Sequence, residues 1–213
     1  TGRLRIGTSP KSCQFFLPSI LGRFKEEHPR CRFEVVDGDT PECIRMLRAN
    51  EIDLAITLEP RKADEIEFLP WFSDELHLVV PPDHPWAKTG WMKKGEIHKQ
   101  NFILPNKKSY TFFLIMDYLK REEARISSFV EMSNLEAIKE LIKAGFGISF
   151  LATWAVEKEV EAGDLVSVRL ARRKLSRTWG ISSPKGRGLS KTELAFARIG
   201  EQVGCKWMIN REI

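Results

Sequence analysis

Three short apolar segments decide the fold: RLRIGT at residues 3–8, RFEVV at residues 32–36 and IDLAI at residues 52–56. Each has the length of a β-strand, and the residues between them carry apolar side chains at helical spacing. Strands that alternate with helices predict right-handed crossovers and a parallel sheet covered on both faces. The sequence therefore predicts an α/β fold.

The two intervening helices have recognisable limits. Proline at position 29 is expected to stop the first, and Thr40 is the expected N-cap of the second, with Pro41 at its first position. The apolar face of the first helix is expected to consist of Phe15, Phe16, Ile20, Leu21 and Phe24.

A second series of alternating elements follows Pro60. It is preceded by two extended runs, Ile66–Phe72 and Leu76–Val80, with polar residues between them. The predicted strands are 102–104, 126–131 and 148–151, and the predicted helices are 112–119, 135–143 and a closing helix at 193–203. Two such series predict two similar lobes, and the closing helix could belong to either.

Composition agrees with a soluble, globular chain. The 213 residues are 42% hydrophobic and 30% charged, which excludes disordered, collagen-like and disulfide-scaffold classes. The four cysteines show no metal-binding or redox spacing, so free thiols in a reducing cytoplasm are expected. No apolar run reaches the roughly 18 residues of a membrane span, and no signal peptide is recognisable. Because the sequence starts at Thr1 rather than Met, we expect a piece of a longer protein.

The net charge of +5 is too small to require a nucleic-acid partner. Its excess lies between Leu165 and Thr192, where there is no acidic residue. A solvated basic face is favoured there over a phosphate-binding groove, because no aromatic residues alternate with the basic ones. The basic residues are Arg169, Arg172, Arg173, Lys174, Arg177, Lys185, Arg187 and Lys191.

Motifs for catalysis are not recognisable. The sequence has no G-x-S-x-G, H-E-x-x-H or G-x-x-x-x-G-K-[ST] pattern, and its four histidines have no partner at metal-ligand spacing. We therefore expect no enzyme activity, no cofactor and no metal site.

Polar loops that follow strands are the better candidates, because ligands of open α/β sheets bind outside the carboxyl ends of the strands. The first loop, residues 8–13, favours an anion at a helix N-terminus, although N-capping by Ser9 or Ser12 is an equal alternative. Similar loops are residues 57–60, 105–109 and 133–136. Ser133 and Glu136 form a capping box, which leaves Asn134 as the ligand candidate there, and Ser190 to Glu193 forms a second, structural one.

Cys13 lies near a helix N-terminus beside Lys11, where a thiol can have a lowered pKa. A role as a small apolar side chain is favoured over a redox sensor, because no second cysteine lies close in sequence.

Several segments, in order and at fitting intervals, resemble the effector-binding domain of LysR-type transcriptional regulators. The opening LRIG at 4–7 and FKEEHP at 24–29 fit its first strand and helix, and EIDLAI at 51–56 fits its G-E-L-D-L-A-I pattern. The most specific match is LHLVVPPDHPWA at 76–87. The later matches are AGFGI at 144–148 and the segment from Trp179-Gly180 through Lys185-Gly186.

The resemblance implies two Rossmann-like lobes of the type II periplasmic-binding-protein kind, joined by a two-segment hinge. The first lobe would be residues 1–73 plus 179–213 and the second residues 74–178, with the hinge at Ser73, Asp74, Arg177 and Thr178. A small effector would bind between the lobes. An N-terminal winged helix-turn-helix domain, absent from this chain, would bind DNA.

The resemblance also implies contact residues. The effector contacts would be Thr8, Ser9, Lys11, Ser12, Thr57, Asn106, Lys107, Ser109, Ser133 and Asn134. Lys11 and Lys107 favour an anionic effector and Glu59 opposes it, while Tyr110, Phe112 and Phe113 suggest a more aromatic pocket than in relatives. Homodimers, and tetramers of the full-length protein, would form through an exposed surface containing Phe16, Ile20, Arg23, Phe33 and Val35.

The leading hypothesis is thus the effector-sensing domain of a bacterial LysR-type transcriptional regulator, acting in the cytoplasm without membrane contact. Closing or shifting the lobes around the effector would alter the oligomer and so control transcription. A solute-binding protein of a transporter is the alternative, and an enzyme on the same two-lobed scaffold is third.

Overall fold

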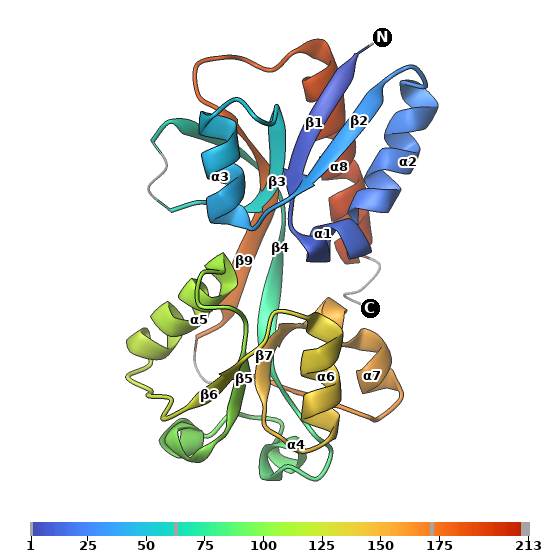
Figure 1. The fold of residues 1–213 in the computed structure, drawn as a ribbon. Coiled ribbons are helices and arrows are strands. Elements are labelled where there is room, and N and C mark those ends of the chain that lie inside the picture. Colours follow the sequence, from blue (N-terminus) through green and yellow to red (C-terminus); the bar gives the residue numbers. More distant parts are fainter. Residues whose placement is uncertain (1, 62–63, 171–172, 210–213) are drawn as a thin grey trace. The chain divides into compact units, whose positions relative to one another are not determined.

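A computed structural model describes residues 2–61, 64–170 and 173–209 (Figure 1). The chain divides into two compact units. Unit 1 consists of Thr1–Ser73 and Arg177–Ile213, and unit 2 is Asp74–Ser176. The strands β4 (Ile66–Val80) and β9 (Leu175–Pro184) each contribute residues to both units.

Unit 1 contains the predicted parallel sheet. Strand β1 (Arg3–Thr8) lies between β2 (Arg32–Asp37) and β3 (Leu54–Leu58), and it pairs with both in parallel. Strand β9 then pairs antiparallel with β3, and β4 follows it. The helices of the unit are α1 (Pro10–Phe15), α2 (Leu17–Glu27), α3 (Thr40–Arg48) and α8 (Lys191–Ile209). The expected α/β fold with parallel strands is therefore confirmed.

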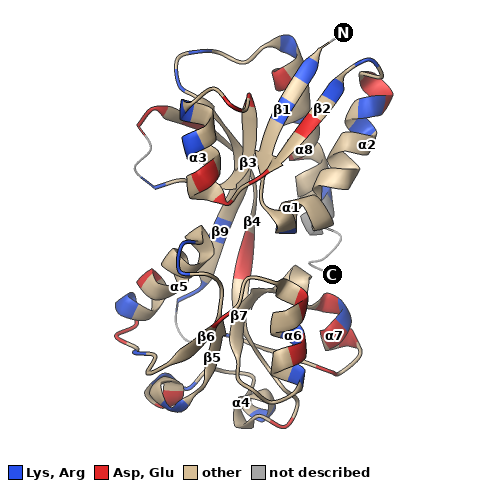
Figure 2. Cartoon of the chain, viewed as in Figure 1, with Lys and Arg blue, Asp and Glu red and all other residues tan. Residues whose placement is uncertain are grey.

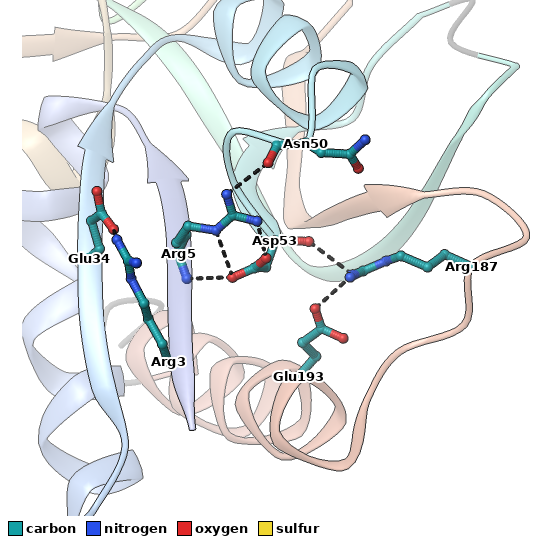
Figure 3. Close-up of polar contacts among 7 residues, drawn as sticks. All are labelled: Arg3, Arg5, Glu34, Asn50, Asp53, Arg187 and Glu193. Atoms are coloured by element: carbon teal, nitrogen blue, oxygen red, sulfur yellow. Dashed lines mark hydrogen bonds and ion pairs between the residues drawn. The ribbon is translucent and has the colours of Figure 1, made fainter. Parts of the chain in front are cut away.

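A polar network explains the EIDLAI segment (Figure 3). The Asp53 carboxylate, just before β3, accepts hydrogen bonds from the Arg5 backbone N–H at 2.8 Å and from Arg5 Nη2 at 2.7 Å. The Arg187 guanidinium donates to the Asp53 carbonyl at 3.1 Å and to the Glu193 carboxylate at 2.7 Å. Asp53 thus ties the start of β3 to β1 and, through Arg187, to the first turn of α8.

The last helix completes unit 1, which settles where the closing helix belongs. Helices α2 and α8 pack together, and Phe24 of α2 contacts Phe196 of α8 with ring centroids 5.6 Å apart. Further along α8, Gly200 and Gly204 lie directly against the Trp71 and Phe72 side chains of β4. The helix runs from Lys191 to Ile209 and is longer than the predicted 193–203.

Unit 2 has a smaller set of strands. Strands β5 (Phe102–Leu104) and β6 (Phe129–Glu131) pair in parallel, as predicted. The third strand of the series, β7 (Ser149–Ala152), instead pairs antiparallel with β4, and a single parallel bridge joins Ile148 to Phe102. Strand β8 (Val166–Val168) pairs antiparallel with β4. The helices are α4 (Pro85–Thr89), η1 (Lys94–Lys99), α5 (Tyr110–Arg121), α6 (Leu135–Lys143), η2 (Thr153–Ala155) and α7 (Glu157–Glu161).

The PPDHPWA segment has a structural role in unit 2. The His84 ring caps α4, because Nδ1 accepts a hydrogen bond from the Trp86 backbone N–H at 3.1 Å. Its Nε2 lies 3.0 Å from the Gln100 amide oxygen, and the buried Trp86 indole donates to Glu96 at 3.0 Å. The segment therefore holds α4 against η1.

The AGFGI segment ends α6 and starts β7. Gly145 has φ +75°, the left-handed conformation in which glycine commonly follows a helix C-terminus. A Cβ atom on Gly147 would lie 2.6 Å from the Asn101 carbonyl oxygen, so the close approach of the two backbones requires glycine there.

Besides β7 and α8, two further elements differ from the prediction. The single helix expected around residues 15–24 is two helices, with Phe16 at the break. Pro18 lies in the first turn of α2, and a continuous helix would force its ring against the carbonyl of residue 14. The two extended runs expected around residues 73–75 are one strand of 15 residues, β4.

Candidate functional site

In unit 1 the candidate residues gather where two neighbouring strands end. Thr8 is the last residue of β1, and it pairs with Ile56, the residue before Thr57 in β3. Both threonine side chains are buried. The Thr57 hydroxyl lies 2.7 Å from the Ser182 hydroxyl of β9, whereas Thr8 Oγ1 has no hydrogen-bond partner among the described residues. An unpaired buried hydroxyl costs about 1–3 kcal/mol, which makes Thr8 the strongest candidate for ligand contact.

The loop after β1 carries a pair of serines. Ser9 caps α1, because its hydroxyl accepts from the Ser12 backbone N–H at 3.4 Å and lies 2.8 Å from the Ser12 hydroxyl. N-capping by Ser9 is therefore confirmed. Helix α1 has only six residues, so its dipole is a weaker basis for anion binding than the sequence suggested. Lys11, on the same turn, is half-buried.

Ser182 was missed in the sequence analysis. It lies on β9, 125 residues from Thr57, and the antiparallel pairing of β3 and β9 brings their hydroxyls together. Thr40 was assigned as a helix cap, yet its buried hydroxyl accepts from the Leu58 backbone N–H at 3.1 Å, and the Asp39 carboxylate caps α3. A carboxylate accepts hydrogen bonds more strongly than a hydroxyl, so Asp39 takes the capping position.

The thiol of Cys13 does not have the lowered pKa of a reactive cysteine. Burial raises the pKa of this thiol, and the negative charge of Asp37 raises it further. The Cys13 sulfur lies 3.9 Å from the Asp37 carboxylate. The raised pKa therefore favours the role of a small apolar side chain over that of a redox sensor.

In unit 2 the candidate loops also start at adjacent strand ends. Leu104 and Glu131 are paired at the ends of β5 and β6, and the Met132 N–H donates to the Leu104 carbonyl at 2.9 Å. The Asn106 side chain accepts from the Lys108 N–H at 2.8 Å, so part of its hydrogen-bonding capacity is used within the loop. The ammonium of Lys107 lies 5.3 Å from the centre of the Phe129 ring.

Two candidate residues of unit 2 are helix caps. Ser109 caps α5 by accepting from the Phe112 N–H at 3.0 Å. Asn134, rather than Ser133, caps α6, accepting from the Ala137 N–H at 3.0 Å. The assignment of the capping box to Ser133 was wrong, because the helix begins one residue later than that box requires. Ser133 is exposed.

The aromatic side chains after this loop contact other rings within unit 2. The Phe112 ring lies 5.5 Å from the Phe129 ring, and Tyr110 stacks on Phe113 at 5.9 Å. Phe113 is nevertheless 48% exposed.

The residues expected at the hinge lie within regular strands. Ser73 Oγ is 3.2 Å from Thr178 Oγ1, and both residues belong to unit 1. Asp74 is buried in unit 2 and accepts a hydrogen bond from the Trp154 indole at 2.8 Å. Arg177 is buried in unit 1, with its guanidinium 5.6 Å from the centre of the Trp179 ring.

Two residues expected on the dimer surface are not on the surface. Phe16 and Ile20 are 0% exposed, and Phe16 packs against Phe72 and Trp179 inside unit 1. The helical face that was expected to meet a partner is the face that covers the sheet. Arg23 and Val35 are exposed and Phe33 is half-buried.

The basic segment is not a uniformly solvated face. Arg177 is buried, Arg187 pairs with the buried Glu193, and Arg173 lies 3.5 Å from the buried Glu122 carboxylate. Arg172 lies outside the described residues. Lysine and arginine residues are spread over the elements of both units instead of forming one stripe (Figure 2).

Other kinds of site have little support in the described part of the chain. No group of three His, Cys, Asp or Glu side chains there lies close enough to hold a metal ion. No helix there is long and apolar enough to cross a bilayer. A cavity of about 270 Å³ in unit 1 is lined by Gly2, residues 28–31 and Thr192, at the opposite end of β1 from Thr8.

Comparison with known proteins identifies relatives among transcriptional regulators. The probable RuBisCO transcriptional regulator of Cyanidium caldarium is 29% identical over 201 residues, which cover 92% of this chain and 63% of that protein. The HTH-type transcriptional regulator CbbR of Sinorhizobium medicae is 26% identical over 209 residues, covering 98% of this chain and 66% of the relative. The chain thus spans less than two thirds of the first of these relatives.

Solved structures share the fold. The Synechocystis PCC6803 CcmR regulatory domain, in complex with 2-PG, has a TM-score of 0.85 at 24% identity and covers 96% of this chain and 98% of its own. The effector binding domain of QuiR, in complex with shikimate, has a TM-score of 0.82 at 22% identity with the same coverage. The two-lobed, periplasmic-binding-protein-like fold class is therefore confirmed. The family sequence model of the LysR substrate binding domain matches residues 1–203, and the chain belongs to that family.

Proposed function

We propose that this chain senses a small-molecule effector for a LysR-type transcriptional regulator and performs no catalysis. Units 1 and 2 would be the two lobes, and the strand-end loops that begin at Thr8, Thr57, Asn106 and Ser133 would contact the effector. DNA would be bound by an N-terminal winged helix-turn-helix domain of the longer, cytoplasmic protein. The relatives are regulators, which supports this function over the transporter and enzyme alternatives.

The observation that carries the proposal is the buried hydroxyl of Thr8, which has no hydrogen-bond partner in the part of the chain that the structure describes. Buried polar groups without a hydrogen bond are rare in native proteins, because no hydrogen bond compensates their desolvation. A ligand oxygen at the end of β1 would provide the missing partner. The neighbouring hydroxyls of Ser9, Ser12 and Thr57 would offer further contacts from the same unit.

The class of effector follows from these groups. The unit 1 candidates supply hydroxyl groups and one lysine, Lys11, and the unit 2 candidates supply amides, hydroxyls and Lys107. Hydroxyl and ammonium groups together suit a small oxygen-rich anion, such as a carboxylate or a phosphate ester. Glu59, exposed at the end of β3, would limit the number of negative charges that the site accepts.

Thr8→Val tests the proposal, because it replaces the hydroxyl by a methyl group of the same shape. Without ligand, we expect the variant to be as stable as the parent or more so, since an unsatisfied buried hydroxyl is lost. With ligand, we expect about a fivefold to tenfold weaker affinity, the value of one hydrogen bond of about 1–1.4 kcal/mol. Thermal shift followed by calorimetry measures both, with 2-PG, shikimate and a panel of small carboxylates as probes.

Thr40→Val is the matched control. Its hydroxyl is equally buried but accepts a backbone hydrogen bond, so the variant should lose stability and keep its ligand affinity once it is folded. Ser9→Ala with Asn106→Ala should abolish the ligand-induced stabilisation. Unchanged probe affinity in both Thr8→Val and the double variant would show that these loops do not form the site.

Homodimerisation belongs to the same proposal, now restricted to the residues that unit 1 exposes. The exposed side chains of Arg23 and Val35, with the half-buried Phe33, are the remaining surface candidates. Val35 is 39% exposed on β2, the edge strand of its sheet. Val35→Glu should shift a sedimenting dimer towards monomer, and a parent chain that is monomeric at high micromolar concentration would contradict dimerisation of this domain.

A further inference from the structure

A chain of polar contacts in unit 2 lies along one face of β4, outside the proposed effector loops. Glu75 and His77 are two residues apart in this strand, so their side chains point to the same face. Ser167 of β8 pairs with Val79 across the antiparallel ladder and therefore shares that face. Lys174, which precedes β9, is the last member of this series of polar contacts.

The contacts are continuous from Ser167 to Lys174. His77 Nδ1 lies 2.8 Å from the Ser167 hydroxyl, and His77 Nε2 lies 3.3 Å from one Glu75 carboxylate oxygen. The other Glu75 oxygen lies 3.2 Å from the Lys174 ammonium. Because a carboxylate can only accept, the neutral imidazole carries its proton on Nε2 and accepts from the Ser167 hydroxyl at Nδ1.

The surroundings of His77 favour the neutral ring. Burial lowers the pKa of His77, the Glu75 carboxylate raises it, and the positive charges of Arg169 and Lys174 lower it again, with a net decrease. On the other side of β4, strand β7 places the uncharged Leu151 opposite His77. The ring is therefore neutral near pH 7 and gains a proton only in acid.

Protonation changes the competition for Glu75. When His77 is neutral, the ammonium of Lys174 is the positive charge that pairs with the Glu75 carboxylate, and the Lys174 side chain is 77% exposed. A charged imidazolium on the same carboxylate attracts it more strongly and repels the Lys174 ammonium. Lys174 then loses its partner to a group that is already held by Ser167 and the strand.

We propose that Glu75, His77, Ser167 and Lys174 form a proton-responsive link that holds the Lys174 side chain against β4 when His77 is neutral and releases this side chain when His77 is charged. Lys174 directly precedes β9, whose first two residues are the last two of unit 2. Acidification would therefore remove one contact at one of the two strand connections through which unit 2 joins the rest of the chain, while the contact of Arg173 with Glu122 at 3.5 Å remains. The link is independent of the effector loops and does not rest on the proposed function.

The test is an NMR titration of the 213-residue chain between pH 8 and pH 5, following the four histidine rings and the backbone amides. His77→Gln assigns the His77 resonance. We expect Glu75→Gln to lower the His77 midpoint, because it removes the favourable charge, and Lys174→Met to raise it. In the Glu75→Gln background the effect of Lys174→Met should shrink, because the two cations compete through that carboxylate.

The amide shifts of residues 173–176 provide the second measurement. They should titrate with the His77 midpoint in the parent chain and stay flat in His77→Gln. Lys191→Met, which removes an exposed lysine of unit 1, should change neither signal. A His77 midpoint unaffected by Glu75→Gln, or amides of 173–176 that do not follow His77, would overturn the proposal.

Discussion

Replacing Gly200 by alanine should destabilise unit 1, although alanine is the better helix former. Gly200 lies inside α8, where this helix crosses the Trp71 side chain of β4. A Cβ atom at this position would lie 2.0, 2.3 and 2.7 Å from three atoms of the Trp71 indole. These distances are far inside van der Waals contact, and the indole is a rigid, buried ring.

The magnitude follows from two opposing effects. Alanine in place of glycine in a helix interior gains about 1 kcal/mol of stability. Forcing a methyl group into a well-packed core costs about 1–3 kcal/mol. Because these three ring atoms would have to move by about 0.7 to 1.4 Å to reach ordinary contact at 3.4 Å, roughly the upper end of that range applies. We expect a net loss of about 2 kcal/mol in the free energy of unfolding for Gly200→Ala.

Two other glycines provide matched controls. A Cβ atom on Gly22, in the exposed part of α2, meets nothing within 4 Å, so Gly22→Ala should gain about 1 kcal/mol. A Cβ atom on Gly204 approaches the Phe72 ring to 2.6 Å, so Gly204→Ala should lie between the other two.

Urea unfolding of the three variants, monitored by circular dichroism, measures the order of their unfolding free energies. Equal stabilities of Gly200→Ala and Gly22→Ala would refute the packing of α8 on β4.

Three further predictions concern single side chains. Lys139→Ala should cost about 3 kcal/mol in urea unfolding, because it leaves the largely buried Glu159 without its partner at 2.8 Å. Lys143→Ala breaks a more exposed pair and should cost clearly less by the same measurement. His84→Ala removes the cap of α4 and should cost about 1 kcal/mol by the same measurement. Burial alone raises the pKa of Asp53, but the hydrogen bonds and charge of Arg5 outweigh it, so this pKa lies below its usual value. The stabilisation is therefore present above about pH 4 and lost as pH falls through the lowered pKa, and Asp53→Asn should flatten the acid limb of a plot of unfolding free energy against pH.

Local sequence patterns predicted the elements whose causes are local. The strands of unit 1 are apolar runs of strand length, and β1, β2 and β3 pair in parallel as the alternation of strands and helices requires. The capping box from Ser190 to Glu193 is also confirmed, with reciprocal bonds of 2.7 and 3.3 Å. These features depend on residues a few positions apart.

Errors arose where a side chain finds its partner far along the chain. Polar residues 73–75 were interpreted as a break, but the Ser73 hydroxyl meets Thr178 and the Asp74 carboxylate meets the Trp154 indole. The strand continues because both groups are satisfied by tertiary contacts. Phe16 and Ile20 were assigned to a partner surface, and their burial depends on the packing of α2 against elements more than fifty residues away.

The sequence by itself determined the α/β class, the family and the loops that end the strands, because strand length, helical spacing and capping chemistry are read over short distances. The tertiary structure decided which of the candidate hydroxyls have a hydrogen-bond partner. Thr57 is satisfied by Ser182, 125 residues away, while Thr8 is buried with no partner among the described residues. It also decided that Glu75, His77, Ser167 and Lys174 are in contact. Hydrogen bonding and charge act through space, so these groups become a site only when strands that are distant in sequence pair.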